Sequence, residues 1–336
     1  QHHVKCQLAL GDHLALPDQQ IAVVAGKYLI RHILDAANAV CAVEFKGVDY
    51  ISIPQLAALC GMKYTRISKD RKRQSVFSKY SRFDFELHSR SMSLNGTNVW
   101  LCFPIAGKGA NLYIAKRDYV KTIIPIVFPQ KNEKPKNLFR IVIDAGHGGK
   151  DNGAMNKRYG LKEKAVVLDI AMRLGRELKK NGYDVSYTRT RDEFKELSDR
   201  PQKANRQRAN RFLSIHCNAA ANASVSGIET FAITPRWAPS TSSSKLSRSD
   251  STEYPGNDND GWNQLLAYYI QRSLSAATRM PDRGVKRARF AVLRDLKMPG
   301  ALIECGFITN STEARNLGSA ANRQKVAEAI ASAVYQ

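Results

Sequence analysis

The chain has 336 residues, 43% hydrophobic and 24% charged, which is long enough for two globular domains of ordinary size. Lysine and arginine outnumber aspartate and glutamate by 52 to 30, giving a formal net charge of +22. This charge favours polyanionic surroundings such as nucleic acid, anionic lipid or anionic wall polymers. The basic residues are spread over predicted helix faces and loops without a nucleic-acid-binding fingerprint, so we expect no nucleic acid partner.

No stretch of the sequence predicts a membrane-spanning helix. The longest mainly apolar run, residues 21–42, is interrupted by Lys27, Arg31, Asp35 and Asn38. Basic residues before a small-residue end give this run some likeness to a signal peptide, but Asp35 within the apolar part argues against one. We therefore expect no transmembrane anchor in this chain, and a signal peptide is not evident in it.

The six cysteines contain no C-x-x-C pair, which excludes a zinc ribbon or a dithiol redox motif. Cys217 and Cys305 each follow a polar residue at the end of an apolar run, and we expect both to be small buried hydrophobic residues. Pairing among the other four is left open by the sequence: Cys6, Cys41, Cys60 and Cys102.

The texture of the sequence divides the chain into four segments. Residues 1–42 are a lead-in of uncertain structure, and residues 130–138 are a polar linker that contains Pro135. Residues 43–129 carry short alternating runs separated by turns, which predict a small α+β domain. In residues 139–336 strands and helices alternate, which predicts an α/β domain with a mostly parallel twisted sheet flanked by helices.

The first domain contains a strand near 50–54, a short helix near 56–61 that ends in glycine, and a later Asn95-Gly96 turn between strands. These features resemble the copper amine oxidase N-terminal-like domain of exported bacterial proteins. Despite its name, that resemblance implies no copper site. It implies an adaptor domain in an exported protein.

The second domain begins with a buried strand at 140–144, and Asn310 with Glu313 three residues later predicts a helix start near its end. Residues 234–260 are rich in Ser, Asp and Asn, which predicts a mobile surface loop. Between these landmarks we expect helices at 162–181, 200–210, 262–277 and 320–335, and strands at 184–188, 212–216, 228–233, 290–293 and 301–304.

A glycine-rich turn follows the first strand of the second domain. In residues 146–149, Gly-His-Gly-Gly, the glycines let the backbone turn sharply and leave the imidazole of His147 accessible. A phosphate-binding loop is an alternative, but the sequence has neither G-x-G-x-x-G nor a GK pair followed by Ser or Thr here. A histidine in this position suits a metal or a reacting group.

Three further polar residues lie at strand ends or helix starts of this domain: Glu163, His216 and Glu304. Such positions meet at the carboxyl edge of an α/β sheet. Two imidazoles and one carboxylate are a common ligand set for catalytic zinc, with water at the fourth position. We therefore predict that His147, Glu163 and His216 bind one Zn²⁺ per chain, which lowers the pKa of the bound water from about 15.7 to near 7.

Glu304 is the predicted catalytic residue. A carboxylate near the metal but not bound to it takes a proton from water and transfers it to the departing nitrogen, which contributes about 10²- to 10⁴-fold in rate. Taken singly, Glu163 is also explained as a helix-start charge and His216 as a buried core histidine. Glu304 is likewise explained as the ion-pair partner of a residue such as Arg294. The joint occurrence of the four favours the catalytic explanation.

Six motifs occupy the second domain in a fixed order: IVIDAGHGG, LKEKAVVLDIA, SIHCNA, SGIETF, RGVKRARFAVLR and LIECGFITN. Together they resemble the catalytic domain of zinc-dependent N-acetylmuramoyl-L-alanine amidases. The resemblance implies a peptidoglycan hydrolase that cleaves the amide between the lactyl group of N-acetylmuramic acid and the L-alanine of the stem peptide. It also implies a role in cell-wall remodelling or daughter-cell separation, at the periplasm or cell wall.

The same resemblance implies roles for individual residues and partners. It assigns zinc binding to His147, Glu163 and His216, and catalysis to Glu304. Peptidoglycan is the expected substrate, and the first domain is expected to contact the wall or division-associated proteins. Two further residues are implied to bind or orient the substrate: Arg294 and Asn218.

Some family members that act in cell division carry an inhibitory helix where this chain has residues 234–260. The insertion here is polar and has Glu253 as its only glutamate, so we expect a loop that shapes or covers the substrate groove in place of self-inhibition. Two other functions fit parts of the pattern. A wall-binding protein that has lost catalysis is disfavoured by the complete set of four residues, whereas a zinc peptidase would use the same chemistry on a peptide bond.

Overall fold

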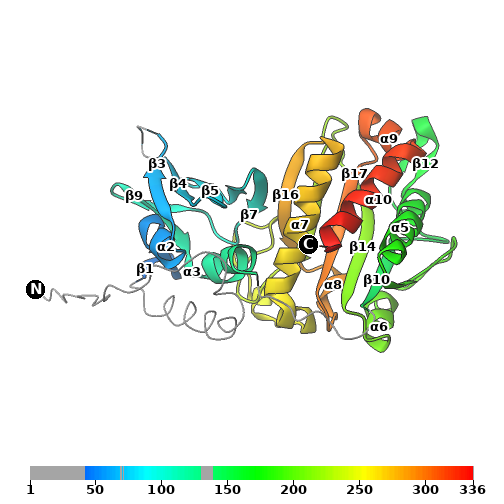
Figure 1. The fold of residues 1–336 in the computed structure, drawn as a ribbon, viewed down its shortest axis with the longest axis horizontal. Coiled ribbons are helices and arrows are strands. Elements are labelled where there is room, and N and C mark those ends of the chain that lie inside the picture. Colours follow the sequence, from blue (N-terminus) through cyan, green and yellow to red (C-terminus); the bar gives the residue numbers. More distant parts are fainter. Residues whose placement is uncertain (1–41, 69, 71, 130–138, 336) are drawn as a thin grey trace, which may run out of the picture.

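The computed structural model describes residues 42–68, 70, 72–129 and 139–335 (Figure 1). The predicted linker at 130–138, and the predicted lead-in apart from its last residue, lie outside the described residues. Within the described part of the chain, no helix combines the length and the apolar character that crossing a membrane requires.

One mixed sheet of 11 strands runs through both predicted domains. Its first four strands are parallel, then the fifth is antiparallel to the fourth, and the sixth is again parallel to the fifth. The predicted α/β class is confirmed, but the sheet is mixed where a mostly parallel sheet was predicted, and its parallel strands lie at one edge. In spatial order these strands are β13 (Asp184–Tyr187), β10 (Arg140–Ala145), β14 (Arg211–Asn218), β17 (Gly300–Phe307), β15 (Ile228–Ile233) and β16 (Asp282–Ala288).

The sheet continues from β16 into the first domain. The pair formed by β16 and the next strand is parallel, and every later pair is antiparallel. A separate four-stranded sheet and short helices complete this half. The continuing strands are β7 (Thr97–Trp100), β6 (Ser91–Leu94), β5 (Arg82–Glu86), β4 (Arg73–Phe77) and β3 (Lys63–Arg66); the separate sheet holds β1 (Val43–Phe45), β2 (Val48–Ser52), β9 (Asn111–Ala115) and β8 (Ala106–Lys108).

Three long helices cover one face of the parallel strands, as Figure 1 shows: α5 (Glu163–Lys180), α7 (Asp260–Thr278) and α10 (Ala320–Tyr335). On α5 the apolar residues recur at helical spacing, and they pack on the isoleucines of β10 and β14. The opposite face is covered at one end by α6 (Asp199–Arg206) and α8 (Ala291–Arg294). Polar side chains occupy the same face at the other end of the strands, where β14 and β17 end.

The predicted elements of the first domain occur where expected. Helix α2 (Ile53–Leu59) follows β2 and is capped by Ser52, whose hydroxyl accepts from the amide of Gln55. The Asn95-Gly96 turn joins β6 to β7 with positive φ at both residues, as a tight hairpin requires. The likeness to a copper amine oxidase N-terminal-like domain stays a prediction. The first domain of this chain ends in three consecutive helical segments: α3 (Lys116–Asp118), the π-helical η1 (Tyr119–Ile123) and α4 (Ile124–Val127).

Strand β7 is tied to β16 by side chains as well as by the sheet. Asn98 donates its backbone N–H to the carboxylate of Asp282 at 2.7 Å and its amide to the carbonyl of the same residue at 2.9 Å. The indole of Trp100 donates to the carbonyl of Arg283 at 3.0 Å. Arg287, 1% exposed, donates to the carbonyl of Lys121 at 2.7 Å. The two halves therefore share partly buried polar contacts, in addition to the covalent connection.

The segment 234–260 is a surface loop, as predicted, and its mobility stays a prediction. It contains two short 3₁₀ helices, η3 (Arg248–Ser251) and η4 (Pro255–Asn259). Its Asp250 is 6% exposed and forms an ion pair with Arg289 at 2.5 Å. Thr241 exchanges hydrogen bonds with Arg287 of β16. Buried polar groups therefore anchor this loop, which a count of apolar residues does not detect.

The segment 234–260 also lies away from the position expected for a groove cover. It follows the end of β15 that points away from Glu229, and Arg90 and Arg117 of the first domain donate to its backbone carbonyls. The insertion therefore braces the two halves of the molecule.

The predicted strand at 290–293 is the short helix α8, and the strand of this region is β16, at 282–288. Strand β16 was not predicted because three of its seven residues are Arg or Lys, which interrupt the apolar pattern of a strand. The other predicted strands and helices of the second domain are confirmed with small shifts at their ends. Asn310 caps α9 (Ser311–Gly318) by accepting from the amides of Thr312 and Glu313.

Gly284 provides a test of the junction. Its φ is +90°, and a Cβ there would lie 2.8 Å from the carbonyl oxygen of Asn98 in β7. Gly182 also has positive φ, +82°, but a Cβ there would meet nothing within 4 Å. Gly284→Ala should therefore lower the free energy of unfolding by about 2–4 kcal/mol, and Gly182→Ala by about 1–2 kcal/mol, in urea titrations. Equal losses would show that β7 does not press on β16.

Candidate active site

Three predicted ligands meet at the carboxyl end of the parallel strands. His147 follows β10, Glu163 begins α5 and His216 lies in β14. The Oε1 atom of Glu163 is 3.0 Å from Nε2 of His147 and 3.1 Å from Nδ1 of His216. Potential ligand atoms of the three residues all lie within 4.8 Å of one another, which makes this a possible metal site. We call these residues the His-Glu-His cluster.

Glycines permit this close approach. A Cβ on Gly146 would lie 2.3 Å from Cε1 of His216, and a Cβ on Gly153 would lie 2.5 Å from Oε2 of Glu163. His147 itself has a positive φ of 58°, a conformation that is costly for a residue with a side chain. The turn is therefore strained and closely packed at the cluster.

Two buried arginines, which the sequence reasoning missed, hold this turn. Arg189, 1% exposed, donates to the carbonyls of Ala145 at 2.9 Å, Gly146 at 2.6 Å and Lys164 at 2.8 Å. Arg200, 3% exposed, donates to the carbonyl of His147 at 3.0 Å. Each guanidinium thus fixes carbonyl groups next to a cluster residue.

The charge of Arg200 is balanced by Asp144 of β10. Arg200 donates to Oδ1 of Asp144 at 2.8 Å, and the hydroxyls of Thr188 and Ser214 donate to the same carboxylate at 2.6 and 2.7 Å. Burial acts to raise the pKa of Asp144, but Arg200 and these hydroxyls hold it below its ordinary value. An aspartate inside an apolar strand was the sequence signal that could have revealed a buried partner.

Glu163 is held as a carboxylate. It is 3% exposed, and burial acts to raise its pKa, but hydrogen bonds from His147 and His216 lower the pKa well below its ordinary value. Its Oε2 accepts the amide N–H of Ala154 at 2.8 Å, and its Oε1 that of Cys217 at 2.9 Å. An anionic oxygen between two imidazoles is the arrangement that a divalent cation stabilises.

An outer carboxylate orients His147. Its Nδ1 is 2.8 Å from Oδ2 of Asp151, so the Nε2 atom is turned toward Glu163. Burial acts to lower the pKa of His147, but Glu163 and then Asp151 raise it above its ordinary value. A carboxylate behind a histidine is the usual means of fixing the ring of a metal ligand.

Glu304 lies beside the cluster on β17. It is paired with His216 across β14 and β17, so both side chains emerge on the same face of the sheet. Its Oε2 atom is closed to solvent and has no hydrogen-bond partner among the described residues. Burial, with the nearby charges of Glu163 and Glu229, raises its pKa well above the ordinary value.

Asn218, which the resemblance implied to bind or orient the substrate, belongs to a polar group next to Glu304, and its role stays a prediction. The sequence reasoning missed the other members of the group: Glu229, Arg283 and Lys286. The amide of Asn218 donates to Oε1 of Glu229 at 2.6 Å. Arg283 donates to Oε2 of Glu229 at 2.9 Å, and Lys286 forms an ion pair with the same oxygen. Glu229 is paired with Glu304 across β15 and β17. These residues lie on the face of the sheet that carries the Glu304 side chain.

The structure does not bring Arg294 to the cluster. Strands β15 and β16 run opposite to β17, so α8, which follows β16, lies at the other end of the sheet (Figure 1). There the guanidinium of Arg294 lies 5.4 Å from the ring centre of Tyr254. The expectation that it orients Glu304 has no geometric support.

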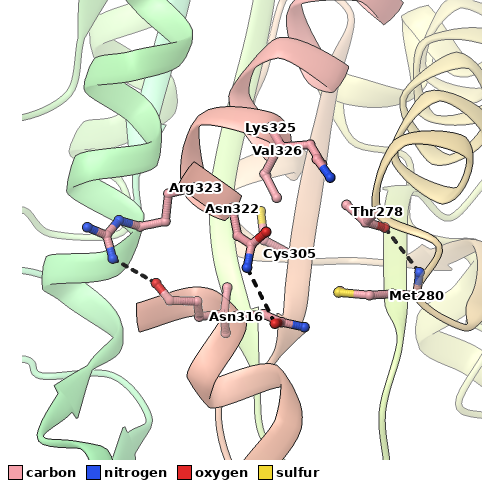
Figure 2. A pocket seen from close by; sticks show the side chains of 9 residues that line it. Thr278, Met280, Cys305, Asn316, Asn322, Arg323, Lys325 and Val326 are labelled. Atoms are coloured by element: carbon pink, nitrogen blue, oxygen red, sulfur yellow. Dashed lines mark hydrogen bonds between the residues drawn. The ribbon is translucent and has the colours of Figure 1, made fainter. Parts of the chain in front are cut away.

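A cavity on the helical side of the sheet lies apart from this site. Figure 2 shows it between the end of α7, β17, α9 and α10, with Asn322 donating to Asn316 and the amide of Met280 donating to Thr278. Its volume of about 40 Å³ has room for only one or two water molecules. Cys305 lines it as a buried thiol, and Cys217 is also buried, as predicted.

The model of a protein family described as N-acetylmuramoyl-L-alanine amidase matches residues 141–336. The chain belongs to this amidase family. It is similar to the amidase AmiA of Escherichia coli K12, with 34% identity over 247 residues that cover 67% of this chain and 85% of AmiA. It is also similar to the amidase LytC of Bacillus subtilis 168, with 38% identity over 190 residues that cover 56% of this chain and 34% of LytC.

A solved amidase structure from Clostridium difficile 630 has the same fold in this region. It has 32% sequence identity and a TM-score of 0.51, and the match covers 60% of this chain and 96% of that one. The predicted enzyme class, an N-acetylmuramoyl-L-alanine amidase, is thereby confirmed. The family match spans the His-Glu-His cluster and Glu304, and the first half of the amidase lies outside it.

Asp144→Asn tests the support of the glycine turn. The substitution leaves Arg200 buried without its anionic partner, which should lower the free energy of unfolding by about 3–5 kcal/mol. Asp169, which pairs with Arg173 and Arg323 near the surface, is the matched control, and Asp169→Asn should cost about 0–1 kcal/mol. Urea titrations monitored by circular dichroism compare the two; similar losses would contradict the role assigned to Asp144.

The same carboxylate predicts a pH dependence. Because the folded-state pKa of Asp144 is depressed, its stabilising effect is complete above its unfolded pKa of about 3.9 and is lost as the pH falls through the lower folded value. The Tm of the wild-type chain should therefore decrease more steeply than that of Asp144→Asn in this acidic range. Parallel Tm profiles would assign the acid sensitivity to other groups.

Proposed function

We propose that this amidase is a zinc-dependent peptidoglycan hydrolase that cleaves the amide between the lactyl group of N-acetylmuramic acid and L-alanine. The observation that carries the proposal is the His-Glu-His cluster with Glu304 on the same face of the sheet. The family match supports the amide substrate. A zinc peptidase would show the same cluster, so the bond that is cut decides between the two enzymes.

The residues of the cluster fit a zinc ion. Two imidazoles and a carboxylate are a known catalytic zinc set, and Asp151 provides the outer contact that such a histidine normally makes. We infer that His147, Glu163 and His216 hold the ion. When bound, Zn²⁺ supplies Lewis-acid polarisation of the carbonyl and lowers the pKa of water to about 7.

Glu304 is proposed to move the proton. Its carboxylate takes a proton from the water whose oxygen adds to the amide carbon. It then returns the proton to the alanine nitrogen as the carbon–nitrogen bond breaks, which leaves a carboxylic acid on the lactyl group and a free amine on the peptide. The surroundings that raise the pKa of Glu304 favour its holding the proton between these two events.

We also propose that the enzyme acts outside the cytoplasm, at the periplasm or cell wall, in wall remodelling or daughter-cell separation. A surface with a net charge of +22 suits an anionic wall. The alternative of a wall-binding protein without catalysis is disfavoured, because all four residues are present in one place.

Mass spectrometry of digested peptidoglycan tests the reaction. We expect free stem peptides that begin with alanine, beside intact sugar strands. A chelator should abolish this digestion and added zinc should restore it. Release of terminal amino acids from the stem would identify a carboxypeptidase, and digestion that survives removal of metal would refute the zinc proposal.

Glu304→Gln separates catalysis from metal binding. The amide cannot accept the proton, so kcat should fall by about 10²- to 10⁴-fold. Zinc content measured by atomic absorption should stay at one ion per chain, because Glu304 is not a member of the cluster. Glu253→Gln is the matched control, since Glu253 is an exposed partner of Arg236 in the insertion. A near-native rate for Glu304→Gln would reassign the base.

A further inference from the structure

The polar face that carries the active site does not end with the amidase domain. Glu304 is paired with His216 on one side and with Glu229 on the other, so all three side chains share one face of the sheet. The opposite face of these strands carries the isoleucines that pack under α5, α7 and α10. The position of the polar face can therefore be followed strand by strand.

The polar face crosses from β15 to β16 and then to β7 through direct contacts. Lys286 of β16 forms an ion pair with Glu229, and its Nζ lies 5.8 Å from the ring centre of Trp100 in β7. Val285 and Val99 form the pair that joins the two strands, and both are buried on the other face. Three strand spacings of about 4.8 Å separate β7 from β17, which is about 14 Å across the sheet.

Beyond Trp100 the same face forms a groove of about 460 Å³, a size typical of ligand sites. Ser91 is paired with Trp100, and Ser93 is paired with Asn98 on one side and Asp84 on the other. Ser91, Ser93, Asn98 and Asp84 all line the groove. The groove is thus a continuation of the active-site face into the first domain.

The groove is polar without a net charge of its own. Arg73 is paired with Glu86 at 3.4 Å, and Arg82 is paired with Asp84 at 2.9 Å. The remaining polar groups on its floor are serine hydroxyls and the Asn98 amide. On a chain with a net charge of +22, such a neutral surface suits a hydroxyl-rich polymer better than a polyanion. The aromatic ring of Trp100, on the strand position paired with Ser91 of the groove, suits a sugar ring.

We propose that this groove, together with Trp100 beside it on β7, binds the glycan strand of peptidoglycan and so extends the substrate site into the first domain. The proposal rests on the proposed function. The sugar chain lies along the polar face, with one ring against Trp100 and the peptide-bearing unit at the His-Glu-His cluster. The first domain then contributes directly to substrate binding, and β16 connects its groove to the catalytic residues.

Glycan strands without peptide stems test this proposal, because they contain no bond for the amidase to cut. Their binding to the full chain, measured by isothermal titration calorimetry, reports the groove independently of catalysis. Trp100→Ala should weaken this binding by about tenfold, as expected for the loss of one buried aromatic contact. Trp237→Ala is the matched control, because Trp237 is 48% exposed in the insertion, away from the groove, and its loss should leave binding unchanged.

A second variant covers the case in which Trp100→Ala unfolds. Ser93→Trp fills the groove from a strand position on its floor and should also weaken binding by about tenfold, with Tm showing that the fold is kept. Unchanged affinity in a folded Ser93→Trp or Trp100→Ala chain would overturn the proposal. Glycan binding that depends on Trp100 in a chain that cuts no peptidoglycan would refute the proposed function alone.

Discussion

The geometry of the candidate active site depends on two buried guanidinium groups that hydrogen-bond to the glycine turn. Arg189 and Arg200 gather the carbonyl oxygens of residues 145–147 and balance part of their charge against Asp144. Their hydrogen bonds fix a backbone that would otherwise relax, because His147 is held at positive φ. Only with this turn in place does the imidazole of His147 reach the carboxylate of Glu163. The two arginines thus contribute to the site by positioning the backbone that carries His147.

The two faces of the sheet differ in composition and role. Isoleucine, valine and leucine side chains on one face pack under three long helices and provide most of the apolar burial. Among the described residues, α6 and α8 cover one end of the other face, and His216, Glu304 and Glu229 lie at its opposite end. Polar groups in such a position need not all be satisfied by the protein. Catalysis can therefore occupy this face without opening the core.

The candidate site could be predicted from the sequence, whereas the relation between the two halves could not. The four residues lie near the carboxyl ends of strands or at the start of a helix, and parallel strands bring such positions together: His147, Glu163, His216 and Glu304. The contact of β16 with β7 joins residues about 180 positions apart, and no local pattern announces it. Arg294 was misplaced for a related reason. Its motif follows a strand whose reversed direction carries it to the far end of the sheet.

The shared sheet has a consequence for the integrity of the chain. Asn98 and Trp100 bind the backbone of β16, and Arg287 reaches back to Lys121, so the interface is built like the interior of one domain. A protease that severed the chain between residues 129 and 139 would break one covalent connection and leave these contacts in place. The two fragments would remain associated as a nicked complex, and separately expressed fragments would be candidates for reassembly by complementation.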